Sequence, residues 1–497
     1  MSDIVTSFRL VVPLGITLVA PVLIWLTGKD PNKREAVSFG AAILTLLSVL
    51  SLFPPVLSGK ILVLNLFHLL PGIDVKLCAD GLTLIFAFVA SFLWILATSY
   101  NIGYMRSLKE HAQTRYYFCF AVAIFGAVGV AMSANIFTLY LFYEIITIFT
   151  YPLVAHHQDA EGYAGGRKYI VYLMGTSKLF LLPAMILTYV LAGTLDFHLG
   201  DMVQGIFPAD ADPVLVTITY VLYILGIAKA AIMPLHNWLP SAMVAPTPVS
   251  ALLHAVAVVK AGVFSISRVI LSGFGVELLN DLHLGLPLAY AAAFTIVVAS
   301  IIALTKDDLK ARLAYSTVSQ LSYIIIGVAM LTPVAVQGGL IHIANHAFSK
   351  ITLFFAAGAI FVSCNLRSIR LMSGIGRKMP WTFGAFAVAS LSMIGIPPVC
   401  GFVTKWFLVN GAVQIHQVIL LVCLLASTLL NAAYFGPVVY KAFFGKPVYA
   451  ELPFAYEGVK EAPLCMVIPL CITAAISVII GIYPEPVIQL IQIFRGM

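Results

Sequence analysis

The sequence has few charged residues, and this scarcity excludes a soluble globular protein. Only 10% of the 497 residues are Asp, Glu, Lys or Arg, whereas 61% are hydrophobic. A soluble chain of this length could not remove so much apolar surface from water. Apolar runs of about 20 residues, enough to cross a bilayer as a helix, recur along the whole chain. The composition therefore predicts an all-α polytopic membrane protein.

The sequence also lacks the patterns that bind common cofactors. Its seven cysteines are scattered and no two have CxxC spacing, so neither a zinc site nor an iron–sulfur cluster is predicted. It has no glycine-rich phosphate loop and no dinucleotide fingerprint. The net charge of +7 arises from basic residues in short loops, which does not indicate nucleic-acid binding. We therefore expect no cofactor, no metal and no nucleic acid.

About fourteen apolar runs are predicted to span the membrane. The first run follows an N-terminus without a cleavage site, so no removable signal is expected. The segment 59–78 is too polar to span, and its ILVLNLFHLL portion is predicted to form an extended ribbon at the surface. The predicted spans are 9–27, 36–57, 80–103, 115–132, 135–156, 167–193, 213–233, 248–271, 287–304, 312–331, 337–363, 381–412, 416–441 and 463–485.

The basic residues alternate between loops, and this alternation predicts an orientation. The even loops hold little beyond Lys60 and Lys76, and the sixth loop is acidic. By the positive-inside rule the odd loops are cytoplasmic, and both termini lie on the outer face of the cell's inner (plasma) membrane. The basic residues of the odd loops are Lys29, Lys33, Arg34, Arg106, Lys109, Arg115, Arg167, Lys168, Lys306, Lys310, Arg312, Arg367, Arg370, Arg377, Lys378, Lys441, Lys446 and Lys460.

Ionisable residues inside the predicted spans carry the functional information, because a charge in hydrocarbon is costly. A lysine near a helix end, such as Lys260 or Lys405, can also be an interfacial anchor. A single histidine such as His254 often only bonds a neighbouring helix, and Lys178 fits a structural role as well as a functional one. The residues of this kind are Glu144, Lys178, Lys229, His254, Lys260, His342, His346, Lys350 and Lys405.

The stretch HIANHAFSK places His342, His346 and Lys350 four residues apart on one predicted helix. This spacing predicts one shared face over about 12 Å of helical rise. Three stacked titratable groups are poor structural contacts, but they suit a proton relay.

Prolines predict two broken spans. Lys229 is followed by Pro234 and Pro240, and Lys405 is preceded by GIPP at 395–398. Interrupted membrane helices are tolerated where the freed backbone faces protein or water, and they mark transport sites in repeat-built transporters. Spans 4–8 and 9–13 are predicted to be two five-helix repeats of inverted topology. The predicted regions are 1–112 with three spans, the first repeat 113–273, the second repeat 286–442, and a C-terminal span in 443–497.

Six stretches between the third and twelfth spans form recognisable motifs. They are ADGLTLIF (79–86), the mid-span Glu144, KAAIMPLHNWLPSAMVAPTPVSALLHA (229–255), KDDLKARLAYSTVSQLSY (306–323), HIANHAFSKITLFFAAG (342–358) and GIPPVCGFVTKW (395–406). At these stretches the chain resembles the antiporter-like subunits shared by respiratory complex I, the Mrp cation/proton antiporters and the membrane-bound energy-converting hydrogenases. The resemblance implies fourteen helices, two inverted repeats, and broken seventh and twelfth helices.

The resemblance also implies roles for the residues of the first half. Glu144 and Lys229 would form its charged pair, and Lys260 would bridge the two halves with His254 beside it. Lys178 departs from the pattern of the sixth helix, which leaves the number of relay sites in this half open.

In the second half the resemblance implies a continuation of the same path. Lys350, with His342 and His346, would lead through the eleventh helix to Lys405 as the terminal residue.

The predicted function is that of a proton-translocating, antiporter-like membrane subunit of a multisubunit complex. That complex is either an Mrp-type Na⁺/H⁺ antiporter or a redox-driven pump of the complex I or hydrogenase type, so enzyme status stays open. Expected partners are other membrane subunits, including homologous antiporter-like ones, the lipid bilayer and H⁺, with Na⁺ left open. The alternatives are a stand-alone transporter of a small solute and a structural subunit with an inactive channel.

Overall fold

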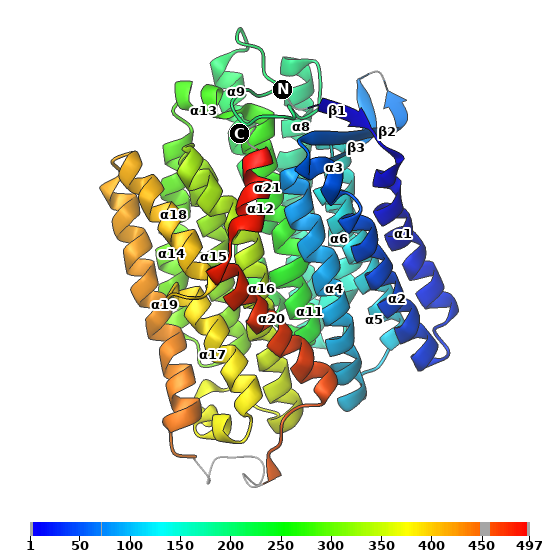
Figure 1. Cartoon of the computed structure of the whole chain (residues 1–497), viewed down its shortest axis with the longest axis vertical. Helices are drawn as coiled ribbons and strands as arrows, with labels where there is room; N and C mark the ends of the chain where they lie inside the picture. Colours follow the sequence, from blue (N-terminus) through cyan, green and yellow to red (C-terminus); the bar gives the residue numbers. More distant parts are fainter. Residues whose placement is uncertain (1–2, 71, 448–457, 495–497) are drawn as a thin grey trace.

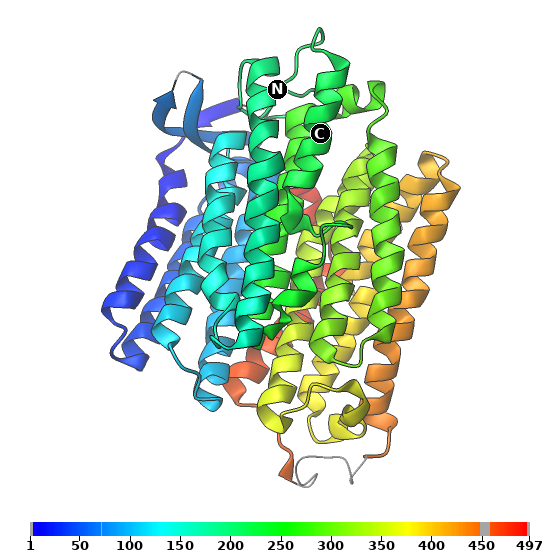
Figure 2. The same ribbon diagram turned by 180° about the vertical axis from the view of Figure 1, so that it is seen from behind.

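The chain folds into a bundle of long helices, seen from opposite sides in Figures 1 and 2. The computed structural model describes residues 3–70, 72–447 and 458–494. Among these residues, eleven helices are long and apolar enough to cross a membrane. The predicted all-α polytopic membrane class is therefore confirmed. Parts of the predicted C-terminal region, 448–457 and 495–497, lie outside the described residues.

The N-terminal region contains a small sheet in addition to helices. Strand β2 pairs in parallel with β1 and antiparallel with β3, with Ile4 opposite Ile61 and Leu64 opposite Leu77. The predicted ribbon is thus confirmed, and the sheet caps one end of the bundle (Figure 1). The elements are β1 (Asp3–Thr6), η1 (Phe8–Leu10), α1 (Val11–Leu26), α2 (Pro31–Leu50), α3 (Phe53–Leu57), β2 (Lys60–Leu70), β3 (Ile73–Ala79) and α4 (Gly81–Ser107).

The first half of the remaining chain contains three π-helical segments, η2, η5 and η6. Such segments insert a residue into a helical turn and occur often at functional sites. The elements are α5 (Gln113–Ala131), α6 (Ile136–Val154), α7 (Ala160–Thr176), η2 (Ser177–Leu181), α8 (Leu182–Ala192), α9 (Pro213–Gly226), η3 (Ala228–Ala230), α10 (Trp238–Ser241), η4 (Ala242–Val244), α11 (Thr247–Ala251), η5 (Leu252–Val256), α12 (Val258–Arg268), η6 (Val269–Phe274) and α13 (Val276–Asp281).

The second half is built around one long helix, α16. It packs against α15, α17, α18, α20, α4 and the α11–η5–α12 segment, and so lies at the centre of the bundle. The elements are α14 (Gly285–Thr305), α15 (Leu309–Ala329), α16 (Pro333–Cys364), η7 (Ile369–Met372), η8 (Ile375–Arg377), α17 (Pro380–Ile394), α18 (Cys400–Gln414), α19 (Val418–Phe444), α20 (Leu464–Ile482) and α21 (Glu485–Phe494).

Short polar side chains start the central helices. Asp80, Asn135 and Asp308 accept hydrogen bonds from the backbone N–H groups of Thr83, Thr138 and Ala311, at 2.9, 2.7 and 2.7 Å. Each satisfies a donor that the first turn of a helix leaves free. These caps fix where α4, α6 and α15 begin and hence the depth of the residues along them.

Two of the predicted spans are interrupted, as expected from their prolines. Helix α9 ends at Gly226 and is followed by the short turn η3, and residues 395–399 separate α17 from α18. Helices in the ranges predicted for the seventh, tenth and twelfth spans fall outside the eleven membrane-length helices. The count of fourteen and the division into two repeats therefore stay predictions. The described ends of the chain, β1 and α21, lie toward the same end of the molecule (Figure 1).

Candidate functional site

A line of buried ionisable side chains passes through the interior of the bundle. Lys229, His254, Lys260, His346 and Lys350 have no exposed surface at all. Because charged groups are almost never fully buried without a partner, each of them calls for an account of its contacts.

Glu144, on α6, is held by residues of the π-helical segment η2. Its Oε1 accepts a hydrogen bond from the Ser177 hydroxyl, and its Oε2 lies 3.2 Å from the Lys178 ammonium. Lys178 also donates to the Tyr140 hydroxyl at 2.5 Å, and 47% of its side chain is exposed. The sixth-helix lysine, whose role was open, is therefore the direct ion-pair partner of Glu144.

Lys229, the expected partner of Glu144, has different contacts. Its Nζ donates to the backbone carbonyl of Tyr143, the residue before Glu144, and lies 3.1 Å from the centre of the Tyr143 ring. Within the described part of the chain it makes no ion pair with Glu144. The expected direct pairing is wrong, because the Tyr143 carbonyl and ring occupy the ammonium of Lys229 from the same turn of α6.

The turn that carries Lys229 is packed tightly against α12. A Cβ atom at Gly262 would lie 2.3 Å from the backbone N of Ala230 and 2.4 Å from the carbonyl C of Lys229. Only glycine permits such a close approach of two backbones. Gly262 thus fixes the position of Lys229 relative to Lys260, two residues earlier on α12.

Lys260 connects the two halves of the bundle. Its Nζ lies 2.8 Å from Nδ1 of His346, which belongs to α16. When the lysine is charged it donates, so Nδ1 must then be the acceptor of a neutral imidazole. Lys260 is fully buried, so it does not act as an interfacial anchor.

His342 leads from α16 toward the second broken helix. Its Nδ1 lies 3.1 Å from the Thr404 hydroxyl, and its ring is 5.7 Å from that of His346. Asn345 donates both to Thr404 and to the Cys400 carbonyl, at 2.9 and 2.8 Å, and so fastens the start of α18 to α16.

Lys405 lies at the break itself. Its Nζ donates to the Ile394 carbonyl at the end of α17, at 2.6 Å, and to the Thr428 hydroxyl at 3.0 Å. The carbonyl freed by the broken helix is therefore satisfied by the lysine. The Tyr323 ring lies 5.5 Å from the Lys405 ammonium and 5.6 Å from the His342 ring.

Lys350 points to yet another helix. Its Nζ donates to the Ser316 hydroxyl on α15 at 2.7 Å. The expectation that His342, His346 and Lys350 share one face therefore needs correction. Four residues advance an α-helix by about 400°, so each step rotates the side chain by about 40°, and the three residues contact α18, α12 and α15 in turn.

His254 lies in the π-helical segment η5, with its ring 4.8 Å from that of Phe354. Neither of its ring nitrogens has a hydrogen-bond partner among the described residues, and the same is true of Nε2 in His342 and in His346. Buried polar atoms without a protein partner are usually satisfied by ordered water. These nitrogens therefore mark where the interior is polar enough for water.

A cavity of about 260 Å³ opens at the end of the bundle opposite the sheet. It lies between the two halves, and Lys310 closes one side of it by donating to the Ala245 carbonyl at 2.6 Å. Thr247, on another wall, begins the helix that reaches His254 about 10 Å further along, at 1.5 Å per residue. Other lining residues are Tyr104, Glu110, His157 and Arg367.

Several contact residues were not predicted from the sequence. Ser177, Tyr143, Thr404 and Ser316 are polar residues of ordinary apolar helices, and nothing in their spacing marks them. The cluster of Glu110 with His111, His156 and His157 was also missed. A signal for it was present, because both segments lie in odd-numbered predicted loops and so meet at one end of the bundle.

Comparison with known proteins agrees with this arrangement. The model of the family described as "NADH:quinone oxidoreductase/Mrp antiporter, TM" matches residues 133–431. The chain belongs to this family. The resemblance inferred from the sequence motifs is thereby confirmed, and the matched residues include every buried ionisable group described above.

Members of the NADH:quinone oxidoreductase/Mrp antiporter family from different complexes are similar to the chain. NADH-quinone oxidoreductase subunit N of Desulforudis audaxviator is 32% identical, over 84% of this chain and 84% of that protein. A probable K⁺/H⁺ antiporter subunit of Rhizobium meliloti is 31% identical over 92% of this chain, which spans only 45% of that longer protein. One chain of the membrane-bound sulfane sulfur reductase, described as an archaeal respiratory membrane complex, superposes with a TM-score of 0.86 at 25% identity, covering 98% and 97% of the two chains.

Proposed function

We propose that the chain is the proton-translocating subunit of a larger membrane complex. The observation that carries this proposal is the contact between Lys260 and His346, which joins the ionisable residues of the two halves through one hydrogen bond. A structural subunit gains nothing from such a contact, because buried charges are costly in a membrane. A transporter of small solutes would need a cavity lined by neutral polar groups at this position.

The chemistry of the interior favours protons over Na⁺. A hard cation such as Na⁺ requires several oxygen ligands, whereas the interior line consists mainly of lysine and histidine nitrogens. The carboxylate of this line, Glu144, already engages Ser177 and Lys178. A chain of nitrogen bases can pass a proton along it, but it repels a metal cation.

The proposed route begins at the cavity beside Lys310 and reaches His254 along the α11–η5 helix. From there it continues to Lys260, then His346 on α16, and ends at Lys405 on the broken twelfth span. Glu144, Lys178 and Lys229 form the coupling group of the first half.

The size of the electrostatic terms fits one proton step. Two unit charges 3.2 Å apart, as in Glu144 and Lys178, interact by about 5 kcal/mol at an effective dielectric constant of about 20. Solvation of the half-exposed lysine reduces this value. Moving one proton against 100 mV costs about 2.3 kcal/mol, so rearranging this pair can gate one step.

The exposure of Lys178 supports an assembly with other subunits. The lysine lies on the outer surface of a membrane helix next to Leu179, which is 69% exposed. Lipid cannot solvate an ammonium group, whereas a polar surface of a second subunit can. The relatives from quinone oxidoreductase and antiporter complexes support the same proposal, in the plasma membrane with both termini outside.

The test is transport by the assembled complex. The complex is purified through a tag on this chain and reconstituted into liposomes with a pH-sensitive dye, and its subunit composition shows whether redox or antiporter subunits accompany it. Lys260→Met and Glu144→Gln should each reduce proton translocation at least tenfold while the subunit composition stays intact. Lys168→Met, in a loop, is the control. Wild-type rates in both interior variants would refute the proposal.

A further inference from the structure

Two loops at the end of the bundle opposite the sheet bring three histidines and a glutamate together. Glu110 and His111 lie between α4 and α5, and His156 and His157 lie between α6 and α7. The ligand atoms of Glu110, His111 and His157 lie within 4.8 Å of one another. Glu110 Oε2 is 3.7 Å from Nε2 of His156 and 3.8 Å from Nδ1 of His157.

We propose that Glu110, His111 and His157 form a binding site for a divalent transition metal of the Zn²⁺ type. Two imidazole nitrogens and one carboxylate oxygen are a three-ligand set that leaves a fourth position for water. Bonds of about 2.1 Å in a tetrahedron place ligand atoms about 3.4 Å apart. The present separations reach that spacing by small side-chain rotations, for which the exposed His111 is free.

His156 provides a second, independent observation. It is fully buried, and neither of its ring nitrogens has a hydrogen-bond partner within residues 3–70, 72–447 and 458–494. Its ring lies 4.7 Å from that of His111 and its Nε2 faces the Glu110 carboxylate. A buried imidazole that faces a ligating carboxylate is placed to orient that carboxylate on a metal.

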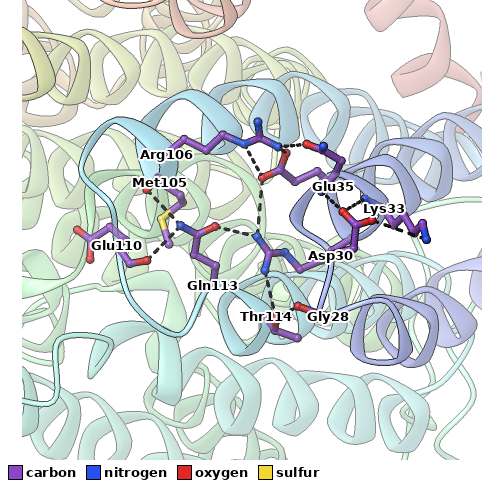
Figure 3. Close-up of polar contacts among 11 residues, drawn as sticks. Gly28, Asp30, Lys33, Glu35, Met105, Arg106, Glu110, Gln113 and Thr114 are labelled. Carbon is purple, nitrogen blue, oxygen red and sulfur yellow. Dashed lines mark hydrogen bonds and ion pairs between the residues drawn. The ribbon is translucent and has the colours of Figure 1, made fainter.

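The backbone of the Glu110 turn is held in place by its neighbours, as Figure 3 shows. The Gln113 amide donates to the carbonyls of Glu110 and Met105, at 3.1 and 3.3 Å, and its oxygen accepts from Arg34 at 2.7 Å. On the other loop, Arg115 donates to the His156 carbonyl at 3.1 Å. Both loops are thus fastened to α5, so the ligands are positioned before a metal arrives.

The electrostatics of the cluster also suit a metal. Burial raises the pKa of the Glu110 carboxyl, but the surrounding histidines outweigh it and the net shift is downward. Burial lowers the pKa of His157, which favours the neutral imidazole. An ionised carboxylate and a neutral imidazole are the forms that ligate metals.

The position of the site gives it a consequence for transport. Glu110 and His157 line the cavity that also contains Lys310 and Arg367. A bound Zn²⁺ would add two positive charges at the mouth of this cavity and oppose the entry of a proton there. Metal binding itself does not depend on the proposed function, and the two are measured separately.

The test is Zn²⁺ binding to the purified full-length chain after treatment with a chelator. ZnCl₂ is titrated in competition with a chromophoric chelator, and one equivalent should bind with micromolar affinity. His111→Ala combined with His157→Ala should weaken this binding at least 100-fold, and Glu110→Gln at least tenfold. His68→Ala is the matched control, because His68 forms an exposed two-residue pair with Asp74 at 2.7 Å.

Two outcomes would overturn the inference. One is the absence of a stoichiometric Zn²⁺ site in the wild-type chain, and the other is unchanged affinity in the double variant. Because His111 is exposed, His111→Ala alone keeps the fold and should still lower the affinity. X-ray absorption at the zinc edge should then show one nitrogen ligand fewer than in the wild-type chain. In the reconstituted complex, Zn²⁺ should inhibit the wild type but not the double variant.

Discussion

The hydrogen bond between Lys260 and His346 permits a decisive substitution. His346→Gln keeps a side chain of similar length and an oxygen that can accept from the Lys260 ammonium, but the amide cannot carry a proton. His346→Leu removes both the acceptor and the proton carrier. The two variants therefore separate a relay role of His346 from a role in positioning Lys260.

The geometry gives the magnitude. Two positive charges 2.8 Å apart would repel by about 6 kcal/mol at an effective dielectric constant of about 20, which is a factor of about 10⁴ in population. The pair therefore holds one positive charge at a time, and a proton that arrives at one member is shared with or passed to the other. Without His346, the next base on α16 is His342, about 6 Å further along the helix, beyond the reach of one hydrogen bond.

Both variants should therefore reduce proton translocation by the reconstituted complex at least tenfold. The assay is the initial rate of dye quenching in proteoliposomes, normalised to the amount of assembled complex. His416→Gln, at an exposed turn, should keep the wild-type rate. A wild-type rate in His346→Gln together with a loss in His346→Leu would refute the relay role and leave His346 as an acceptor that positions Lys260.

Two further predictions concern the first half. Gly262→Ala should lower the melting temperature and the transport rate, because a Cβ 2.3–2.4 Å from the Lys229 turn forces that turn to move, at a cost of about 1–3 kcal/mol. Gly175→Ala, where a Cβ meets open space, is its control, and equal melting temperatures in the two variants would contradict the close-packing argument. Lys178→Met should reduce coupled transport several-fold by removing the partner of Glu144, whereas Lys178→Arg should preserve it. Undiminished transport in Lys178→Met would show that the ion pair has no part in coupling.

The sequence predicted the features that depend on local pattern. Hydropathy located the helices, prolines located the interruptions after Gly226 and at 395–399, and the polar segment 59–78 was correctly taken as extended. These features are set by residues close together in the chain, where composition and spacing act directly.

The sequence could not predict which charged groups face one another. Lys178 lies in the π-helical segment η2, whose extra residue rotates the helix face by about 100°, and no residue type marks such a segment. Glu144 therefore meets Lys178, and Lys229 meets a backbone carbonyl. Loop histidines escaped notice for another reason: an intramembrane charge stands out against apolar neighbours, whereas His111 and His157 lie among ordinary polar residues.

The rotation of side chains along α16 changes the path that the sequence implied. A straight stack would pass a proton from His342 through His346 to Lys350, but His346 faces Lys260 on one side and His342 on the other. Through Thr404 and the Tyr323 ring, His342 approaches Lys405. Lys350 faces Ser316 and lies on a branch. We infer that α16 is a junction of three helices, with His346 at the point where the halves join, and that Lys350 acts through its charge on this point.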